Sequence, residues 1–390
     1  MKTNKSKQTG FTPLSKRMAG FSLIELMIAM VIGLLVMSGV FQVFISTKHA
    51  NKTLLAEAEM QENARFAFSV ITSIVQEAGN FGCQASNAMT HNSIVNSTDN
   101  TFRPERVIEG WEAKNTAFGD TYTTNANTGV SGTNTLHWTT SAAGNAQIDA
   151  GTKSKKYSDV FKVWYTKKQK TNLTAIAAGV LSFNALDIDK GDILAINDCQ
   201  SVNFAQVCAC EEADCTGNDS SADINQGACN SPGNNPVNFL NINLPTTEIG
   251  VLEAALFFVG KRATGTTGYQ QNMPSLYVRH LDNDGTLGNK EEILEGVESL
   301  QVLYGEDINA NQSPNMYVSA DDVTNWSNVV SLKISLLLRS LKNNIVAGSQ
   351  TLEFNGANIN VDDTHDDKPD RYLRRVFTST IALRNRNIGY

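Results

Sequence analysis

The chain has 390 residues, enough to enclose a substantial hydrophobic core, and its 41% hydrophobic and 18% charged residues are ordinary for a folded protein. Its formal net charge of −7 is unevenly distributed, because residues 1–20 carry five basic side chains and no acidic one. Without that basic leader the chain carries −12, which argues against nucleic acid or anionic lipid as a general partner of the remainder.

A long apolar segment follows the basic leader. Residues 21–47 contain one charged side chain, Glu25, and the 22 residues from Leu26 to Thr47 contain none. As a helix rising about 1.5 Å per residue, these 22 residues would extend about 33 Å and could cross the hydrocarbon core of a bilayer. Basic flanking residues stay in the cytoplasm, so we expect an inner-membrane span in contact with lipid and a periplasmic domain after it.

The small residue Gly20 precedes the apolar segment, whereas a secretory signal peptide has its small-residue cleavage site after the apolar core. Cleavage after Gly20 would remove the leader and keep the apolar helix. Glu25 is the second unusual feature, because an unpaired acid costs several kcal/mol in lipid and therefore indicates a function. The alternative is a carboxylate near the interface that the dipole at the helix N-terminus favours.

The helix is expected to continue beyond the membrane, through an amphipathic half at residues 48–82. Residues 48–78 contain no Pro and no Gly, and Gly79 supplies a stop signal. Apolar residues recur there at spacings of three and four, as on an amphipathic helix. They are Leu54, Leu55, Ala58, Met60, Ala64, Phe66, Ala67, Val70, Ile71, Ile74 and Val75. The sequence thus predicts one helix from about residue 21 to residue 78.

Residues 83–390 are expected to form a globular, β-rich domain. Residues 84–160 are rich in Asn, Thr, Ser and Gly and predict long variable loops with short strands, and residues 208–238 form a cysteine-rich loop. Alternating or compact apolar runs predict strands at 161–165, 191–197, 256–259, 276–281, 300–304, 332–338 and 377–383, with 256–259 and 276–281 as a hairpin. A helix followed by strands predicts an α+β fold, a long N-terminal helical spine packed on an antiparallel sheet.

All six cysteines follow the apolar segment, at Cys83, Cys199, Cys208, Cys210, Cys215 and Cys229. An even number on one side of a membrane anchor indicates disulfides in an oxidising compartment, and reduced thiols are the alternative. Four thiolates between 208 and 229 could also hold zinc, but they lack the usual two-to-four-residue spacing. A bond between Cys208 and Cys210 is disfavoured because one intervening residue strains the bridge, so two bridges within 208–229 are expected with their pairing open.

Two Asx-rich segments have alternating oxygen ligands that could suit calcium, Asp282-x-Asp284-Gly285 and Asp307-x-Asn309-x-Asn311. Neither completes an EF-hand loop, and Asx turns explain both. The acidic run at Asp362, Asp363, Asp366, Asp367 and Asp370 fits a solvated loop. The histidines are scattered, at His49, His91, His137, His280 and His365, and no hydrolase, metalloprotease or phosphate-loop motif is present. We therefore expect neither catalysis nor a cofactor or metal.

The string Gly20-Phe21-Ser22-Leu23-Ile24-Glu25, joined to the basic leader and the apolar run, resembles the type IV prepilin cleavage motif. The resemblance implies that a prepilin peptidase cleaves after Gly20 and methylates the new N-terminal Phe21. It also implies that Glu25 guides docking into the growing filament by pairing with a neighbour's N-terminal amine.

Four places are similar to the PilW family of minor pilins. They are Ala78–Cys83, Gly191–Cys199, Gly296–Asp307 followed by Trp326 and Val329–Ser340, and Tyr372–Asn385. The similarity implies a minor pilin that primes type IV pilus assembly near the tip. Its partners would be prepilin peptidase, other minor pilins, the major pilin and the inner-membrane assembly machinery. Cys83 and Cys199 lie in two of these segments, so we expect a disulfide between them that ties the helix end to a strand.

Two other functions remain open from the sequence. A minor pseudopilin of a type II secretion system shares the leader and the helical spine. A pilus-borne adhesin would use residues 84–160 or 208–238 to contact a surface or ligand.

Overall fold

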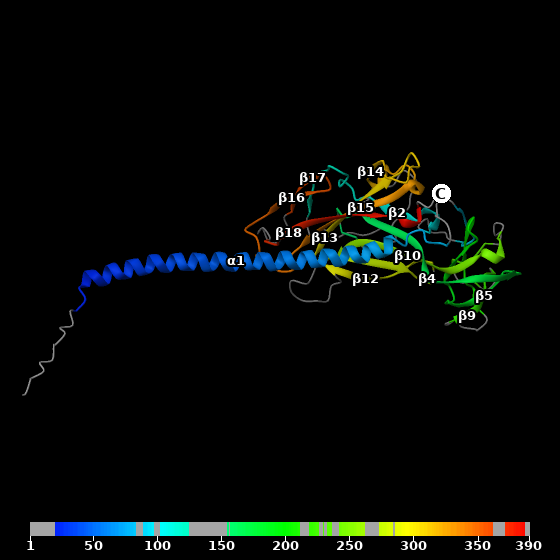
Figure 1. The fold of residues 1–390 in the computed structure, drawn as a ribbon, viewed down its shortest axis with the longest axis horizontal. Helices are drawn as coiled ribbons and strands as arrows, with labels where there is room; N and C mark the ends of the chain where they lie inside the picture. Colours follow the sequence, from blue (N-terminus) through cyan, green and yellow to red (C-terminus); the bar gives the residue numbers. More distant parts are fainter. Residues whose placement is uncertain are drawn as a thin grey trace, which may run out of the picture. The chain divides into compact units, whose positions relative to one another are not determined.

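The computed structural model describes residues 20–82, 89–96, 102–124, 154–155, 157–210, 218–225, 229, 232–235, 242–261, 273–283, 285–361 and 371–386. The chain divides into two units, residues 1–52 and residues 53–390. One long helix, α1 (Leu23–Val75), contributes to both units, and the strands all belong to the second (Figure 1).

The part of α1 in the second unit packs one face against the sheets. Its buried residues are Ala56, Met60, Ala64, Ala67, Ile71 and Val75, spaced by three or four positions as on one side of a helix. The predicted helix is confirmed. The expected apolar face was too wide, because Leu54, Leu55 and Phe66 fall outside this stripe and are 62%, 72% and 54% exposed.

The helix ends where the sequence predicts. Gly79 has φ 73°, a backbone conformation that glycine adopts without steric penalty. Its N–H donates to the carbonyl of Trp164 at 2.8 Å, which ties the end of the helix to the sheet. The Asn385 amide donates to the carbonyls of Gln76 and Ala78, both at 3.2 Å, and so satisfies acceptors that the helix leaves unpaired.

The largest sheet is built around two long central strands, β4 (Val160–Ala177) and β10 (Glu248–Lys261), which pair antiparallel. Its strands run in the order β1-β7-β6-β10-β4-β5-β9-β8, with β11 and then β12 added beside β10 and β2 added beside β4. All pairs are antiparallel except β1 with β7. The other strands are β1 (Thr90–Ser93), β2 (Ile108–Trp111), β5 (Val180–Asp187), β6 (Ile193–Asn197), β7 (Ser201–Gln206), β8 (Ala209–Cys210), β9 (Asn218–Asp223), β11 (Pro274–Leu281) and β12 (Leu287–Glu295).

Two smaller sheets complete the second unit. The first has four antiparallel strands in the order β14 (Met316–Val318), β13 (Val297–Glu306), β15 (Val329–Arg339) and β18 (Arg374–Ala382). The second has the order β16 (Gln350–Phe354), β17 (Ala357–Val361) and β3 (Thr123–Thr124), with β17 and β3 parallel. Short 3-10 helices lie between strands: η2 (Pro104–Arg106), η4 (Leu244–Thr246), η5 (Ala320–Asp322), η6 (Trp326–Asn328) and η7 (Arg384–Arg386).

The largest sheet is buried on both faces at β6. On β6, Ile193 and Ala195 belong to the core that includes the buried stripe of α1 and the four-stranded sheet, whereas Leu194 and Ile196 belong to a second core on the opposite face. Successive side chains of a strand point to opposite faces, so a strand buried on both sides is apolar throughout. This accounts for the continuous apolar sequence of β6.

The α+β fold and the predicted strands are confirmed, and the predicted hairpin corresponds to the β10–β11 pair. Residues 84–160 contain short strands, as expected, but β2 is not part of a variable surface, because it lies fully buried beside β4 within the largest sheet. The cysteine-rich segment also differs, since β9 pairs with β5 there. The polar sequence of β9 carries no apolar alternation that could have predicted it.

Candidate functional site

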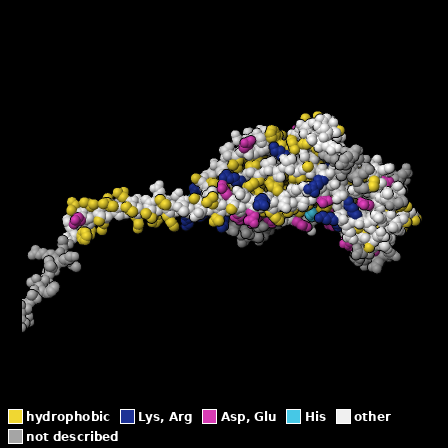
Figure 2. Space-filling view, in the orientation of Figure 1, with side chains coloured by type: hydrophobic (Ala, Val, Ile, Leu, Met, Phe, Trp, Pro, Cys, Tyr) yellow, Lys and Arg dark blue, Asp and Glu magenta, His cyan; other side chains and the backbone are white. Residues whose placement is uncertain are grey.

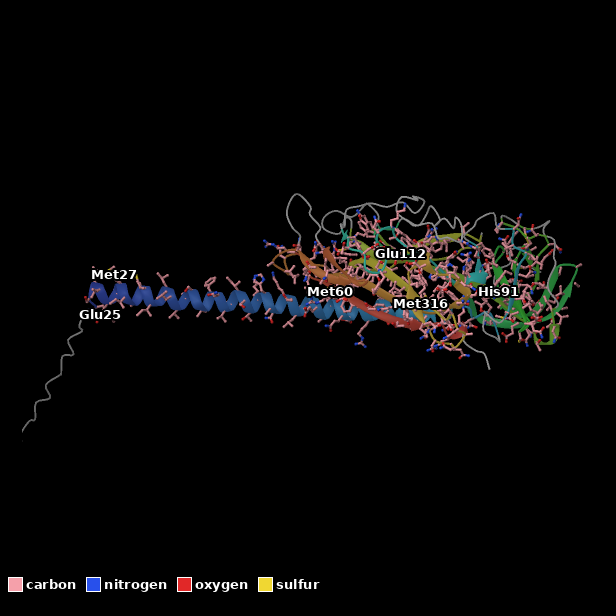
Figure 3. All side chains as sticks on the ribbon, turned by 90° about the horizontal axis from the view of Figure 1, so that it is seen from above. Glu25, Met27, Met60, His91, Glu112 and Met316 are labelled. Atoms are coloured by element: carbon pink, nitrogen blue, oxygen red, sulfur yellow. A yellow bond between two sulfur atoms is a disulfide. The ribbon has the colours of Figure 1, made fainter. Side chains whose placement is uncertain are left out.

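The N-terminus of α1 carries the residues of the predicted processing and docking site. The backbone N–H of Ser22 donates to Glu25 Oε2 at 3.1 Å, and the N–H of Leu26 donates to the Ser22 carbonyl at 3.1 Å. Glu25 thus accepts from one of the backbone donors that a helix start leaves unpaired, as the acid of a capping box does. Figure 3 shows Glu25 at this end of the helix.

The apolar residues that follow this end are left exposed by the part of the chain that the structure describes. Phe21 is 87% exposed, and the large apolar side chains from Leu23 to Ile45 are between 49% and 77% exposed. Figure 2 shows them as a nearly continuous hydrophobic surface on the helix. By length and composition α1 could cross a membrane, and it is the one such helix in the described part of the chain. A surface of this kind requires lipid or other apolar helices around it.

The structure places Gly20 and Phe21 just before the start of α1 and Glu25 in its first turn. The sequence reasoning identified all three but missed Ser22, although Ser-x-x-Glu before an apolar run is a recognisable capping signal. The cleavage, the methylation and the docking role stay predictions.

The cysteines form disulfides within the described residues. Cys208 bonds Cys229, 21 positions apart, within the segment where bridges were expected. Cys199 and Cys210 are also disulfide-bonded, and none of the described cysteines is free. Cys83 and Cys215 lie outside the described residues, so the Cys83–Cys199 pairing stays a prediction.

The segment after β13 uses its side-chain oxygens to hold its own backbone. The carboxylate of Asp307 accepts from the backbone N–H groups of Asn309, Asn311 and Gln312 at 3.3, 3.2 and 2.7 Å. These are Asx-type turns, the alternative to calcium that the sequence favoured. No cluster of His, Cys, Asp or Glu suited to a metal occurs in the described ranges, while Asp284, His137 and the acidic residues from Asp362 to Asp370 lie outside them.

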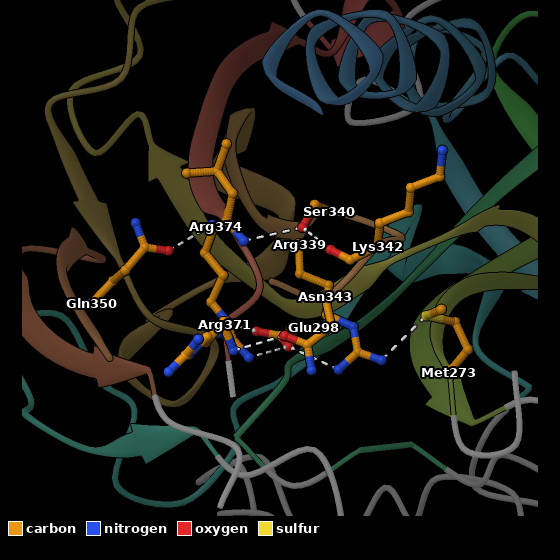
Figure 4. A network of polar contacts seen from close by, with 10 residues as sticks. Met273, Glu298, Arg339, Ser340, Lys342, Asn343, Gln350, Arg371 and Arg374 are labelled. Atoms are coloured by element: carbon orange, nitrogen blue, oxygen red, sulfur yellow. Dashed lines mark hydrogen bonds and ion pairs between the residues drawn. The ribbon is translucent and has the colours of Figure 1, made fainter. Parts of the chain in front are cut away.

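A buried ionic network joins three strands of the four-stranded sheet (Figure 4). Glu298, 2% exposed, accepts from Arg374 Nε at 2.7 Å and Nη2 at 3.0 Å, and Arg339 Nη1 lies 3.4 Å from the same carboxylate. Burial raises the pKa of Glu298, but the positive charges of Arg374, Lys155 and Arg339 outweigh burial and lower it to about 2. The network is a structural device, because removing one partner would leave a buried charge uncompensated.

A second buried pair consists of two carboxyl groups, Asp159 and Glu112. Both oxygens of Asp159 accept backbone N–H groups, from Ala113 at 3.0 Å and Val302 at 2.9 Å, but burial outweighs these bonds and raises the pKa of Asp159 to about 8. Burial, and then the charge of Asp159, raise the pKa of Glu112 to about 10. Thr116 Oγ1 lies 2.7 Å from the Ala113 carbonyl and 3.2 Å from Glu112 Oε1. Since its one hydrogen goes to the carbonyl, a protonated Glu112 can donate to Thr116.

An exposed apolar helix with an acid near its start, continued by a half packed on an antiparallel α+β domain, defines the class of type IV pilins. Two family models match the chain accordingly: the prokaryotic N-terminal methylation motif at residues 15–41, and the type IV pilus-assembly protein W (PilW) model at residues 256–385. These two matches support a type IV pilus-associated pilin similar to the PilW family, and the apolar helix fits a membrane anchor. No curated protein and no solved structure matches it.

Proposed function

We propose that this chain is a minor pilin that primes assembly of a type IV pilus and lies at or near its tip, in a complex with other minor pilins. Prepilin peptidase cleaves it after Gly20 and methylates Phe21. Before assembly it is held in the inner membrane by residues 21–47, with the leader in the cytoplasm and the domain in the periplasm. After assembly it belongs to the extracellular pilus, next to the major pilin. It acts as a structural subunit and not as an enzyme.

The observation that carries the proposal is the combination of an uncovered apolar helix with an acid at its start. The hydrogen bond from Ser22 uses Glu25 Oε2, and Oε1 accepts none within the described residues. An N-terminal ammonium of an adjacent pilin could therefore pair with Glu25 while the helix cap persists. Such a pair would lower the free energy of a carboxylate that is unfavourable in lipid when it is alone.

The size of the domain supports the proposed tip position. Residues 53–390 form one unit with three sheets, and segments such as 84–160 and 208–250 add to it. Helical filaments hold their spines at close and regular spacing, so a bulky head at every position would crowd the subunits above and below. At an end of the filament one side is free.

Deletion of the gene tests the proposal. We expect surface pili to be lost or strongly reduced while the major pilin accumulates in the inner membrane, and complementation with the wild-type chain should restore them. Normal piliation with a defect in protein secretion would instead indicate a pseudopilin. Abundance equal to that of the major pilin, with even spacing along the shaft, would contradict the tip position.

A further inference from the structure

A pocket of about 360 Å³ lies in the second unit, where four separate parts of the chain meet. Its lining includes His91 of β1, Glu105 and Arg106 of η2, Trp326 of η6 and Arg386 of η7. The volume is within the range of small-molecule sites in proteins. Arg386 is the residue that distinguishes this pocket from an ordinary surface hollow.

Arg386 is a buried cation with no acidic partner among the residues that the structure describes. It is 1% exposed, and Nη1 donates to the Ser327 carbonyl at 2.8 Å. Its Nε and Nη2 are buried and donate no hydrogen bond within the part of the chain that the structure describes. Burial lowers its pKa to about 10, so the guanidinium still carries its charge at neutral pH. A buried guanidinium with two unused donor nitrogens is unfavourable unless an anion accepts hydrogen bonds from them.

The neighbouring charges are shared between several groups. Glu109 Oε1 lies 3.0 Å from Arg103 Nη2 and 2.9 Å from Arg106 Nη1, so one carboxylate serves two guanidinium groups. Burial raises the pKa of Glu105, the acidic residue in the lining of the pocket.

We propose that this pocket, the Arg386 pocket, binds a carboxylate whose oxygens pair with the guanidinium of Arg386. The planar fork of a guanidinium matches a carboxylate in geometry, and Glu105 disfavours a doubly charged phosphate or sulfate. Trp326 supplies an apolar wall, as do Met89 and Val323, so the ligand carries a short apolar portion beside its carboxylate. Such a group is found in a free short-chain acid or in the acidic side chain of another protein.

Binding of matched charged and neutral probes to the full-length chain in detergent tests the proposal. We expect ¹³C-labelled butyrate, measured by NMR, to bind with a Kd of about 1 mM or below, and butyramide to bind at least about tenfold more weakly. A blocked Gly-Glu-Gly peptide and its Gly-Gln-Gly counterpart form the second arm. Binding of the Glu peptide alone assigns the carboxylate to a protein side chain, and binding of butyrate alone assigns it to a free acid.

Variants within η7 locate the site. Arg386→Gln should weaken binding of the carboxylate at least about tenfold, whereas Arg384→Gln, an exposed arginine two residues away, should leave it within about twofold. If Arg386→Gln does not fold, the comparison of charged and neutral probes on the wild-type chain still decides. The proposal would be overturned by equal binding of the charged and neutral probes or by binding of neither carboxylate. Tighter binding of sulfate, or unchanged binding by folded Arg386→Gln, would also overturn it.

Discussion

Glu25 accepts a hydrogen bond from the backbone N–H of Ser22, three positions earlier in the chain. The carboxylate that we propose directs docking therefore already takes part in the cap of its own helix. Because a capping box holds the acid at the first turn, Glu25 is positioned before any partner arrives. Position and charge are separate properties of this residue, and substitutions can separate them.

Glu25→Gln should keep the cap, because a Gln side chain also accepts the Ser22 N–H, but it removes the charge. We expect normal membrane insertion and at least about a tenfold loss of incorporation into sheared pili, equivalent to about 1.4 kcal/mol. Ser22→Ala is the matched control, since it keeps the backbone donor and the charge of Glu25. Equal incorporation of Glu25→Gln and wild type, measured by quantitative immunoblotting, would show that the charge has no role.

Glu298→Gln should destabilise the folded domain by about 3–5 kcal/mol, because Arg374 and Arg339 would stay buried without their carboxylate. The control is Glu57→Gln, which breaks an ion pair between α1 and Arg375 in which Arg375 is 45% exposed. That pair should contribute about 1 kcal/mol or less. Denaturant unfolding of the full chain measures both, and similar losses for the two variants would contradict this difference.

Glu112 should make stability fall as pH rises. Its pKa in the folded state, about 10, lies above the value of 4.5 expected when unfolded, so the folded state holds a proton that the unfolded state releases. The proton on Glu112 therefore contributes fully to the free energy of unfolding below about pH 4.5. This contribution is lost progressively towards pH 10, at up to about 1.4 kcal/mol per pH unit. Glu112→Gln should flatten this slope between pH 6 and pH 9. Parallel stability curves for variant and wild type would exclude a protonated Glu112.

Much of the fold could be predicted from local patterns. The helix, its stop at Gly79 and the strands with regular apolar patterns depend on residues close in sequence. The strand β9 could not be predicted in this way, because it pairs with β5 although its polar sequence has no apolar pattern. The bond between Glu298 and Arg374 joins positions 76 residues apart, and only the folded sheet reveals that these charges meet. The cap between Ser22 and Glu25 could also have been predicted, because Ser-x-x-Glu before an apolar run is a capping signal.

The disulfide between Cys208 and Cys229 should stabilise the chain by about 3 kcal/mol in the chain-entropy model, given its separation of 21 residues. Replacing both cysteines with Ala should lower the free energy of unfolding by about that amount under oxidising conditions. Under reducing conditions the variant and wild type should converge. Peptide mapping without reduction should recover Cys208 joined to Cys229 and Cys83 joined to Cys199. A free Cys83 would refute the second pairing.

The central claim is that this chain, similar to the PilW family over residues 256–385, becomes a processed subunit of the pilus. Mass spectrometry of sheared pili, from cells with and without prepilin peptidase, tests it most directly. We predict a mature chain that begins at N-methylated Phe21, present at far lower amounts than the major pilin, and found in pili only when the peptidase is active. A chain that keeps residues 1–20, begins elsewhere, or is absent from pili and remains in the membrane would contradict the claim.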